Sequence, residues 1–301
     1  MALSIAGRHI LRITRLQSCS AAAVRSVHGF NDMEIKEMKE KLSAFPGGSI
    51  DLVKEESGIA VMTVNNPGRI NAFSGTMMLE LEERVAELEG WTEGKGLIVQ
   101  GAGQNFCSGS DLNAVRAMID PKDGMKMCMF MHNTLTRLNR LPLISVALVE
   151  GKALGGGSEL TTACDFRLMA PGSVIQFVHK FMGLVPGWGG AARLVRIVGS
   201  EIALQLMAGA TKVDPDYGMQ IGLASGLVNP ADGADALSKA GQWLARYTKA
   251  PAAVTRAIKK VVVSGRELPL EDALKAEKNI FGTVWGGPAN LAALATKPKH
   301  K

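Results

Sequence analysis

Hydrophobic residues along this chain occur in two patterns. Short continuous runs, at Ile59–Val64, Gly96–Gln100 and Leu143–Val149, are about as long as a strand and end at polar residues or glycine. Such runs predict buried strands. Elsewhere apolar residues recur every three or four positions, which predicts helices. The clearest stripe of this second kind consists of Met78, Leu81, Val85 and Leu88.

Strand–turn–helix units fill the first two-thirds of the chain, whereas the last third has mostly helical spacing. Two short strands are expected at Arg167–Ala170 and Val174–Val178, followed by a loop at His179–Gly187. The helices expected after that loop are Gly189–Val198, Glu201–Gly209, Asp214–Ile221, Asp232–Tyr247, Ala252–Val263 and Leu270–Val284. The sequence therefore predicts an α/β fold. We expect a tail with a short helix over residues 1–49, a core domain over 50–230 and a helical region over 231–301.

The stretch Leu143–Asp165 combines a strand, a glycine run and a helix expected at Leu160–Cys164. The three glycines, Gly155–Gly157, let a ligand approach the backbone closely because they have no Cβ atoms. The first N–H groups of a helix have no internal acceptor and can bind a phosphate or a developing oxyanion. Neither glycine-rich phosphate-binding motif is present, which favours an oxyanion site beside the carboxylate of Glu159. Tight helix–strand packing with a surface Glu is the alternative.

The composition is that of an ordinary soluble globular protein of 301 residues, with 47% hydrophobic and 21% charged residues. The formal net charge is +6, and part of the excess lies at the two ends of the chain. No patch interleaves basic and aromatic residues, so we expect no nucleic-acid partner. The strand-length apolar runs also predict no membrane span. The four cysteines lack CxxC spacing, which indicates a reducing compartment and neither a disulfide framework nor a zinc site.

Four motifs, in this order and spacing, resemble the crotonase superfamily of enoyl-CoA hydratases and isomerases. They are NNPGRINAFS at 65–74, NFCSGSDL at 105–112, PLISVALVEGKALGGGSELTTACDFRL at 142–168 and MGLVPGWGGAARLVRIVG at 182–199. The resemblance runs from about Ile50 to the C-terminus. It implies a crotonase-like superhelix of strand–strand–helix units. It also implies a C-terminal helical oligomerisation region that assembles the chain into a homotrimer or a homohexamer.

The resemblance also implies the active-site residues. The backbone N–H groups of Ser110 and Gly156 correspond to the oxyanion hole that holds the thioester oxygen of an acyl-CoA substrate. Hydratases of the superfamily use two catalytic glutamates: Glu159 matches the first, but the second position holds His179. This departure argues against a hydratase, because hydration uses two carboxylates to activate one water. Histidine can act as acid or base near neutral pH, although a satisfied polar residue at a strand end is the alternative for His179.

Four segments, three of which overlap these motifs, resemble members of the superfamily that remove CO2 from ethylmalonyl-CoA and, less efficiently, from methylmalonyl-CoA. They are FRLMAP, FVHKFMG, PGWGG and GTVWGGPANL. The resemblance implies a carboxy-lyase with a metabolite-repair role and no cofactor, since coenzyme A is part of the substrate. Loss of CO2 leaves a thioester enolate, which two fixed N–H donors stabilise. The alternatives are another crotonase-type enzyme, such as an enoyl-CoA hydratase or isomerase, and a non-catalytic relative that binds acyl-CoA or RNA.

Substrate contacts are implied in the same way. The positions that correspond to CoA contacts are Arg69, Ala72, Ser108, Leu112 and, near the C-terminus, Lys297. Trp188 is a candidate wall of a poorly hydrated pocket for the departing carboxylate, or else a core aromatic. An ionised Glu159 would repel that carboxylate. The sequence leaves open whether Glu159 is protonated or acts through a water or His179.

Two indications of cellular location conflict. The segment Met1–Asn31 contains four Arg and no Asp or Glu, which is typical of a mitochondrial targeting segment. A functionally silent tail fits the same composition. The decarboxylases that the chain resembles act in the cytosol. We therefore expect the cytosol, with the mitochondrial matrix as the alternative.

Overall fold

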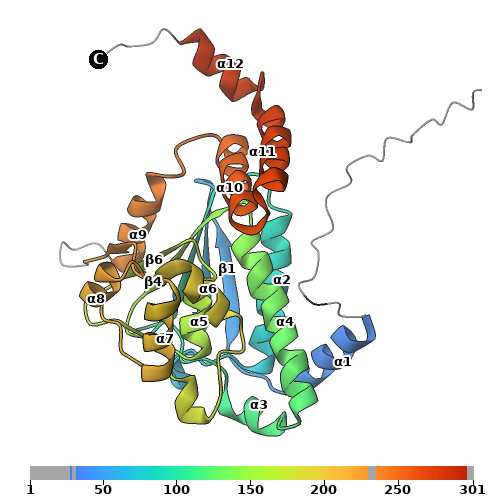
Figure 1. Ribbon diagram of the computed structural model, residues 1–301, viewed down its shortest axis with the longest axis vertical. Helices are drawn as coiled ribbons and strands as arrows, with labels where there is room; N and C mark the ends of the chain where they lie inside the picture. The colour runs from blue at the N-terminus through green and yellow to red at the C-terminus, as the bar shows by residue number, and fades with distance from the viewer. Residues whose placement is uncertain (1–27, 29–31, 230–234, 297–301) are drawn as a thin grey trace, which may run out of the picture.

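The computed structural model describes residues 28, 32–229 and 235–296. Nearly all of the possible targeting segment Met1–Asn31 lies outside these residues, as do Lys297 and the expected helix start at Asp232. Figure 1 shows the helices grouped around a set of strands, with the last helices extending away from the strands toward the C-terminus.

Six strands form the main sheet, in the order β1-β2-β3-β4-β6-β8. β1 pairs with β2 in antiparallel fashion, and the other neighbours are parallel. The strands are β1 Ser49–Lys54, β2 Ile59–Asn65, β3 Gly96–Gly101, β4 Ile144–Val149, β6 Phe166–Met169 and β8 Gly226–Leu227. The strands predicted for β2, β3, β4 and β6 are confirmed. The pattern does not predict β1, because only Ile50 of this edge strand is buried, nor β8, which has two residues.

A second, two-stranded sheet brings the glycine run next to an earlier loop. β5 Lys152–Leu154 pairs in parallel with β7 Val174–Gln176. Cys107 forms an isolated bridge with Ala153, and Ser110 forms one with Phe73. The segment 105–112 therefore lies beside the start of the glycine run, although the two are far apart in the sequence.

The helices alternate with the strands at first and then dominate the chain. In order they are α1 Asp32–Ser43, η1 Pro67–Arg69, α2 Gly75–Glu89, α3 Leu112–Ala117, α4 Pro121–Arg140, α5 Gly156–Thr162, η2 His179–Met182, α6 Gly190–Val198, α7 Ser200–Gly209, α8 Pro215–Gln220, α9 Ala236–Ala245, α10 Ala252–Glu267, α11 Leu270–Val284 and α12 Pro288–Ala295. The helices predicted after residue 188 are confirmed within a few residues. The pattern does not predict α12, which buries none of its residues and so has no core-facing stripe.

The start of α5 differs from the expectation. The apolar segment predicts a helix from Leu160, but α5 begins at Gly156, inside the glycine run. All seven residues of α5 are buried. The helix is therefore fixed on every side by tertiary packing, which compensates for the poor helix propensity of its glycines.

Both faces of the main sheet are covered by helices. Ala147 and Val149 of β4 belong to a large core cluster that includes residues of α1, α2 and α4. Val146 and Leu148, which alternate with them, pack in a second cluster with Leu244 of α9. This alternation follows from the two-residue period of a strand. The sheet is thus buried on both sides, as expected of a largely parallel sheet.

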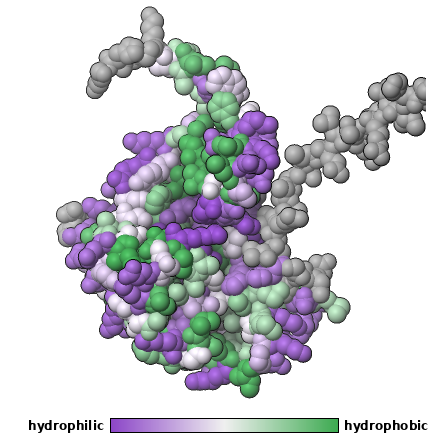
Figure 2. All heavy atoms as spheres, in the orientation of Figure 1, coloured by the Kyte–Doolittle hydropathy of each residue, from purple (hydrophilic) through white to green (hydrophobic). Residues whose placement is uncertain are grey.

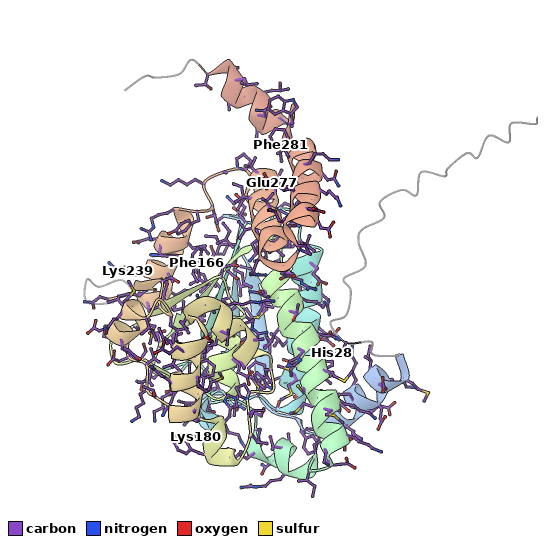
Figure 3. The ribbon with its side chains drawn as sticks, in the orientation of Figure 1. His28, Phe166, Lys180, Lys239, Glu277 and Phe281 are labelled. Carbon is purple, nitrogen blue, oxygen red and sulfur yellow. The ribbon has the colours of Figure 1, made fainter. Side chains whose placement is uncertain are left out.

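The C-terminal helices join the rest of the molecule through α10. Lys259 of α10 is buried and forms an ion pair with Asp165, directly before β6. Beyond α10, large apolar side chains such as Phe281, Trp285 and Leu294 are exposed. Phe281 projects from α11 in Figure 3, and Figure 2 shows apolar surface along this end of the molecule. Within the described ranges, no helix combines the length and the apolar character needed to cross a membrane.

Candidate active site

A cavity of about 170 Å³ lies where the segment 105–112, the start of α5 and the turn before α6 meet. The polar residues along its lining include Ser108, Ser110, Glu159 and His179. The apolar side chains along it are Leu112, Val115, Met127, Val178, Met182, Leu184, Val185 and Trp188. No Lys or Arg occurs among the described residues that line it. A carboxylate in this cavity therefore meets little positive charge.

Glu159 is almost completely buried, with 1% of its surface exposed. Its Oε1 accepts a hydrogen bond from Gly187 N–H at 3.1 Å and lies within hydrogen-bond distance, 3.0 Å, of His179 Nε2. Its Oε2 accepts from Trp188 N–H at 2.8 Å and from Gly190 N–H at 2.7 Å. An ionised carboxylate only accepts hydrogen bonds, so the three converging backbone N–H donors match the ionised form. The alternative of a surface Glu is wrong.

The close approach to Glu159 requires glycine at position 190. A Cβ atom on Gly190 would lie 2.4 Å from Cγ of Glu159. Gly156 is restricted in the same way, because a Cβ atom there would lie 2.9 Å from three carbons of the Trp188 ring. The two glycines let α5 and the turn before α6 pack directly against each other.

His179 begins η2, and 12% of its side chain is exposed. The hydrogen bond from Nε2 to Glu159 leaves Nδ1, which is buried and has no partner among the described residues. Because the carboxylate is an acceptor, Nε2 carries the proton of this bond and Nδ1 is the nitrogen free to exchange one. His179 is therefore not a fully satisfied packing residue.

The backbone N–H groups of Ser110 and Gly156 have no hydrogen-bond acceptor within the described part of the chain. Both residues line the cavity. Gly109 lies directly against the second group, since a Cβ atom on Gly109 would be 3.0 Å from the Gly156 nitrogen. The structure thus brings the two predicted donors to one cavity. Their role as an oxyanion hole stays a prediction.

The predicted substrate-binding residues fall into two groups. Ser108, Leu112 and Trp188 line the cavity. Trp188 is also buried and packed edge-on against Phe73, with ring centroids 5.4 Å apart, so it is a core aromatic that lines the cavity, and its role beside the departing carboxylate stays a prediction. Arg69 and Ala72 do not line the cavity: the Arg69 side chain is exposed and pairs with Asp111, and Ala72 is buried. Lys297 lies outside the described residues. Contacts of these residues with CoA stay predictions.

The sequence interpretation misses the groups that hold Glu159. The N–H donors of Gly187, Trp188 and Gly190 come from the PGWGG turn, which the sequence singles out only as a resemblance and for its tryptophan. Arg193, whose Nη2 donates to Trp188 O at 2.7 Å, is missed completely. Glycines around a tryptophan, directly before a helix, were the available signal for a turn that approaches another element closely.

The described part of the chain gives no support for catalysis by a cysteine thiol or by a bound metal ion. Burial raises the pKa of the Cys107 and Cys164 thiols to about 12, so both are protonated and unreactive at neutral pH. Burial also raises the pKa of Cys128, with a further contribution from Glu159. Among the described residues, no three His, Cys, Asp or Glu side chains are grouped so that they could hold a metal ion.

The family described as enoyl-CoA hydratase/isomerase matches residues 54–286 of this chain. Three relatives, all named ethylmalonyl-CoA decarboxylase, are similar over most of their length. The Danio rerio protein is 70% identical over 267 residues, which are 88% of this chain and 88% of that protein. The Gallus gallus protein is 60% identical over 292 residues, or 97% and 98%. The Rattus norvegicus protein is 55% identical over 300 residues, or 100% and 99%.

Solved structures of enoyl-CoA hydratases share the fold. The Mycobacterium smegmatis enzyme has a TM-score of 0.76 and 22% identity, covering 82% of this chain and 94% of that one. The Bacillus anthracis enzyme has a TM-score of 0.74 and 24% identity, covering 81% and 94%. At these identities the likeness concerns the fold alone, and it confirms the predicted crotonase-like fold. The fold, the match over residues 54–286 and the identity to curated relatives agree, and the chain belongs to the enoyl-CoA hydratase/isomerase family.

Proposed function

We propose that this protein removes CO2 from ethylmalonyl-CoA, and less efficiently from methylmalonyl-CoA, by way of a thioester enolate. The names of the Danio rerio, Gallus gallus and Rattus norvegicus relatives support this function. Within the site, the observation that carries the proposal is the pair formed by Glu159 and His179, 3.0 Å apart, where a hydratase has two carboxylates. A metabolite-repair role follows, in which the enzyme clears a wrongly carboxylated acyl-CoA.

The N–H groups of Ser110 and Gly156 act on the thioester oxygen. When the bond between the α-carbon and the carboxylate breaks, its electron pair moves into the thioester and CO2 departs. The negative charge then develops on the thioester oxygen, where fixed donors are most effective, and each donor is worth about 3–4 kcal/mol in comparable sites. Neither group has a competing acceptor among the described residues.

The cavity favours loss of the carboxylate charge. Its described lining contains neither Lys nor Arg, and apolar side chains such as Leu184, Val185 and Trp188 contribute to its walls. A carboxylate is poorly stabilised in such surroundings, whereas neutral CO2 is not penalised. The ionised Glu159 adds no stabilisation to a second anion. The site thus lowers the energy of the enolate, held by the two N–H donors, relative to that of the bound substrate.

His179 supplies the proton that completes the reaction. The enolate carbon must gain one proton to give the acyl-CoA product, and His179 Nδ1 is the nitrogen without a partner in the described structure. In this mechanism Glu159 accepts from Nε2, which fixes the orientation of the ring. After the transfer, the ring regains its proton from solvent. In this mechanism Glu159 acts through His179.

An enoyl-CoA hydratase or isomerase is the second candidate. This chain shares the fold of the solved hydratases, but a shared fold does not determine which reaction an enzyme catalyses. Glu159 is the only carboxylate in the described lining of the cavity. Hydration would therefore lack the second group that activates the water. A non-catalytic binding role leaves the unpartnered His179 Nδ1 without an explanation.

Purified full-length protein incubated with ethylmalonyl-CoA, methylmalonyl-CoA and crotonyl-CoA distinguishes the candidates. We expect release of CO2 and formation of butyryl-CoA from the first, slower release from the second, and no hydration of the third. Dialysis against a chelator should leave the rate unchanged, because the reaction as written needs no cofactor. Rapid hydration of crotonyl-CoA with no release of CO2 would refute the proposal.

The proposed functional unit is a homotrimer or a homohexamer formed through the C-terminal helices. Exposed apolar side chains follow these helices: Ile258, Val262, Leu270, Leu274, Phe281, Trp285, Leu291 and Leu294. A second copy of the chain would cover this surface, as in the superfamily that the motifs resemble. Clustered exposed apolar residues of this kind are typical of an interface.

The proposed location is the cytosol, where a carboxylase side product would be met. The acid-free segment Met1–Asn31 keeps the mitochondrial matrix as the alternative. Fractionation of cells distinguishes the two, because import would give a matrix form shortened by about 25–30 residues.

A further inference from the structure

Arg193 connects the two elements that hold Glu159. Its Nε donates to Thr162 Oγ1 at 3.0 Å, and its Nη2 donates to Trp188 O at 2.7 Å and to the backbone O of Glu159 at 3.4 Å. Glu159 and Thr162 belong to α5, whereas Trp188 lies in the turn before α6. Arg193 itself is in α6, so one side chain links α5, the turn and α6.

These contacts close a ring around Glu159. The carboxylate of Glu159 accepts from the N–H of Trp188, while Arg193 donates to the C=O of the same residue. The backbone O of Glu159 accepts from Arg193 and from Thr162 Oγ1, the latter at 2.6 Å. The turn is therefore held at both backbone groups of one residue, Trp188. The planar guanidinium can bind several fixed acceptors at once, which a single ammonium group cannot do with the same geometry.

The partners of Arg193 indicate that this position requires the shape and the donor arrangement of a guanidinium group. Its three acceptors among the described residues are neutral oxygens. Burial lowers the pKa of the guanidinium to about 10, although the charge of Glu159 acts in the opposite direction. A partly buried cation without a bonded carboxylate is costly. If Arg193 contributed only to stability, an apolar side chain of similar volume would serve as well.

We propose that Arg193 is a positioning residue of the active site, which fixes the turn 187–190 so that Glu159, and through it His179, keep their alignment. The proposal deepens the proposed function and rests on it wherever turnover is measured. Arg193 is absent from the lining of the 170 Å³ cavity. It therefore acts through Glu159 and not on the substrate.

A second cavity gives access to the guanidinium from outside. This cavity of about 300 Å³ is lined by His132, Thr136, Asn139, Arg140, Gly189, Ala192, Arg193, Arg196 and Glu267. Ala192 and Arg196 in this lining are exposed to solvent. Replacing Arg193 by alanine would enlarge the cavity, so a free guanidinium ion can enter and occupy the vacated position.

The test is chemical rescue of Arg193→Ala in the full-length protein. We expect kcat to fall by about a hundredfold, as for other losses of active-site alignment, with KM for ethylmalonyl-CoA nearly unchanged. Millimolar guanidinium, far below denaturing concentrations, should restore at least a tenth of the lost kcat. Arg193→Lys should retain intermediate activity. Arg196→Ala, one turn further along α6 and in the same cavity, is the matched control and should neither lose activity nor respond to guanidinium.

Amide hydrogen exchange of the segment 186–191 provides a readout that does not depend on the substrate. Loss of Arg193 should speed exchange at the N–H groups of Gly187, Trp188 and Gly190, and guanidinium should slow it again. If wild type fails to decarboxylate ethylmalonyl-CoA, the proposed function is wrong but this exchange test still stands. The positioning role is overturned if Arg193→Ala matches Arg196→Ala in both measurements, or if guanidinium restores neither. If Arg193→Ala does not fold, Arg193→Lys decides, and wild-type kcat with wild-type exchange overturns the role.

Discussion

At the scale of single residues, the charge of Glu159 matters as much as its shape. Each of its oxygens has two hydrogen-bond partners, and three of these four partners are backbone N–H donors that cannot turn away. The sequence leaves open whether this residue is protonated. The structure favours the ionised form, because three of the four surrounding groups are fixed N–H donors and an ionised carboxylate only accepts hydrogen bonds.

Glu159→Gln should therefore be both less stable and less active. Whichever way the amide is turned, its NH2 group meets N–H donors, and an unsatisfied buried polar group costs about 1–3 kcal/mol. We expect a lower free energy of unfolding in urea and a large loss of kcat. Glu277→Gln, at an exposed position on α11 (Figure 3), is the control and should change neither. A stable and fully active Glu159→Gln protein would contradict the assigned charge.

His179→Ala should slow decarboxylation while CoA binding stays nearly unchanged. A positioned acid or base contributes about 10²–10⁴-fold to a rate, and His179 contributes the unpartnered Nδ1. Steady-state kinetics and the affinity for butyryl-CoA measure the two effects separately.

His179→Glu is the complementary variant. It restores two carboxylates to the site and should depress decarboxylation further, with at most a trace of crotonyl-CoA hydration. Turnover of His179→Ala at the wild-type rate would exclude the proton-donor role.

At the scale of elements, the helices and strands that can be predicted from the sequence are those whose apolar residues are buried. Met78, Leu81, Val85 and Leu88 are all fully buried, so their spacing reports the helix directly. β5 has three residues, and its position depends on pairing with β7 and on the bridge from Cys107. Local sequence contains no such information. For the same reason the glycine run indicates Glu159, but the donors of the turn 187–190 become its partners only through tertiary packing.

The attachment of α10 gives a stability prediction. Lys259→Met removes the buried partner of Asp165, which also accepts from Ser145 N–H and Oγ. Breaking a buried ion pair in this way costs about 3 kcal/mol or more. Equilibrium unfolding should show this loss, and the double variant Lys259→Met/Asp165→Asn should recover part of it. Equal stability of wild type and Lys259→Met would mean that the pair does not hold α10.

The same lysine predicts a pH dependence. Burial lowers the pKa of Lys259 from its ordinary value of 10.5, despite the opposing effect of Asp165. Between the folded and unfolded pKa values, the unfolded chain therefore binds more protons, and stability rises with pH. The stability difference between wild type and Lys259→Met should widen as the pH approaches 10.5 from below, as measured by urea unfolding.

At the scale of the whole molecule, the sequence motifs correctly indicate the crotonase-like fold, because four of them occur in family order. The arrangement of the last helices could not be derived in the same way. α11 packs against α10 and α12 buries none of its residues, while both expose large apolar side chains, so neither local pattern nor the core of one copy determines their place.

Phe281→Glu should dissociate the proposed oligomer. Phe281 is 55% exposed, and a charge there opposes burial against a second copy. Sedimentation velocity should show a shift toward monomer. Val53→Glu, at an equally exposed position on edge strand β1, is the matched control and should leave the assembly intact. A wild-type protein that sediments as a monomer would remove the basis of this prediction.

The contact between Gly156 and the Trp188 ring restricts the order in which these positions can change during evolution. A side chain at 156 meets ring carbons at 2.9 Å, so it becomes tolerable only after a smaller residue has replaced the tryptophan. That first step also removes a wall of the cavity and admits bulkier acyl groups. Substrate range and the identity of residue 156 are thus epistatically coupled. Directed evolution toward larger malonyl-type thioesters should randomise both positions together.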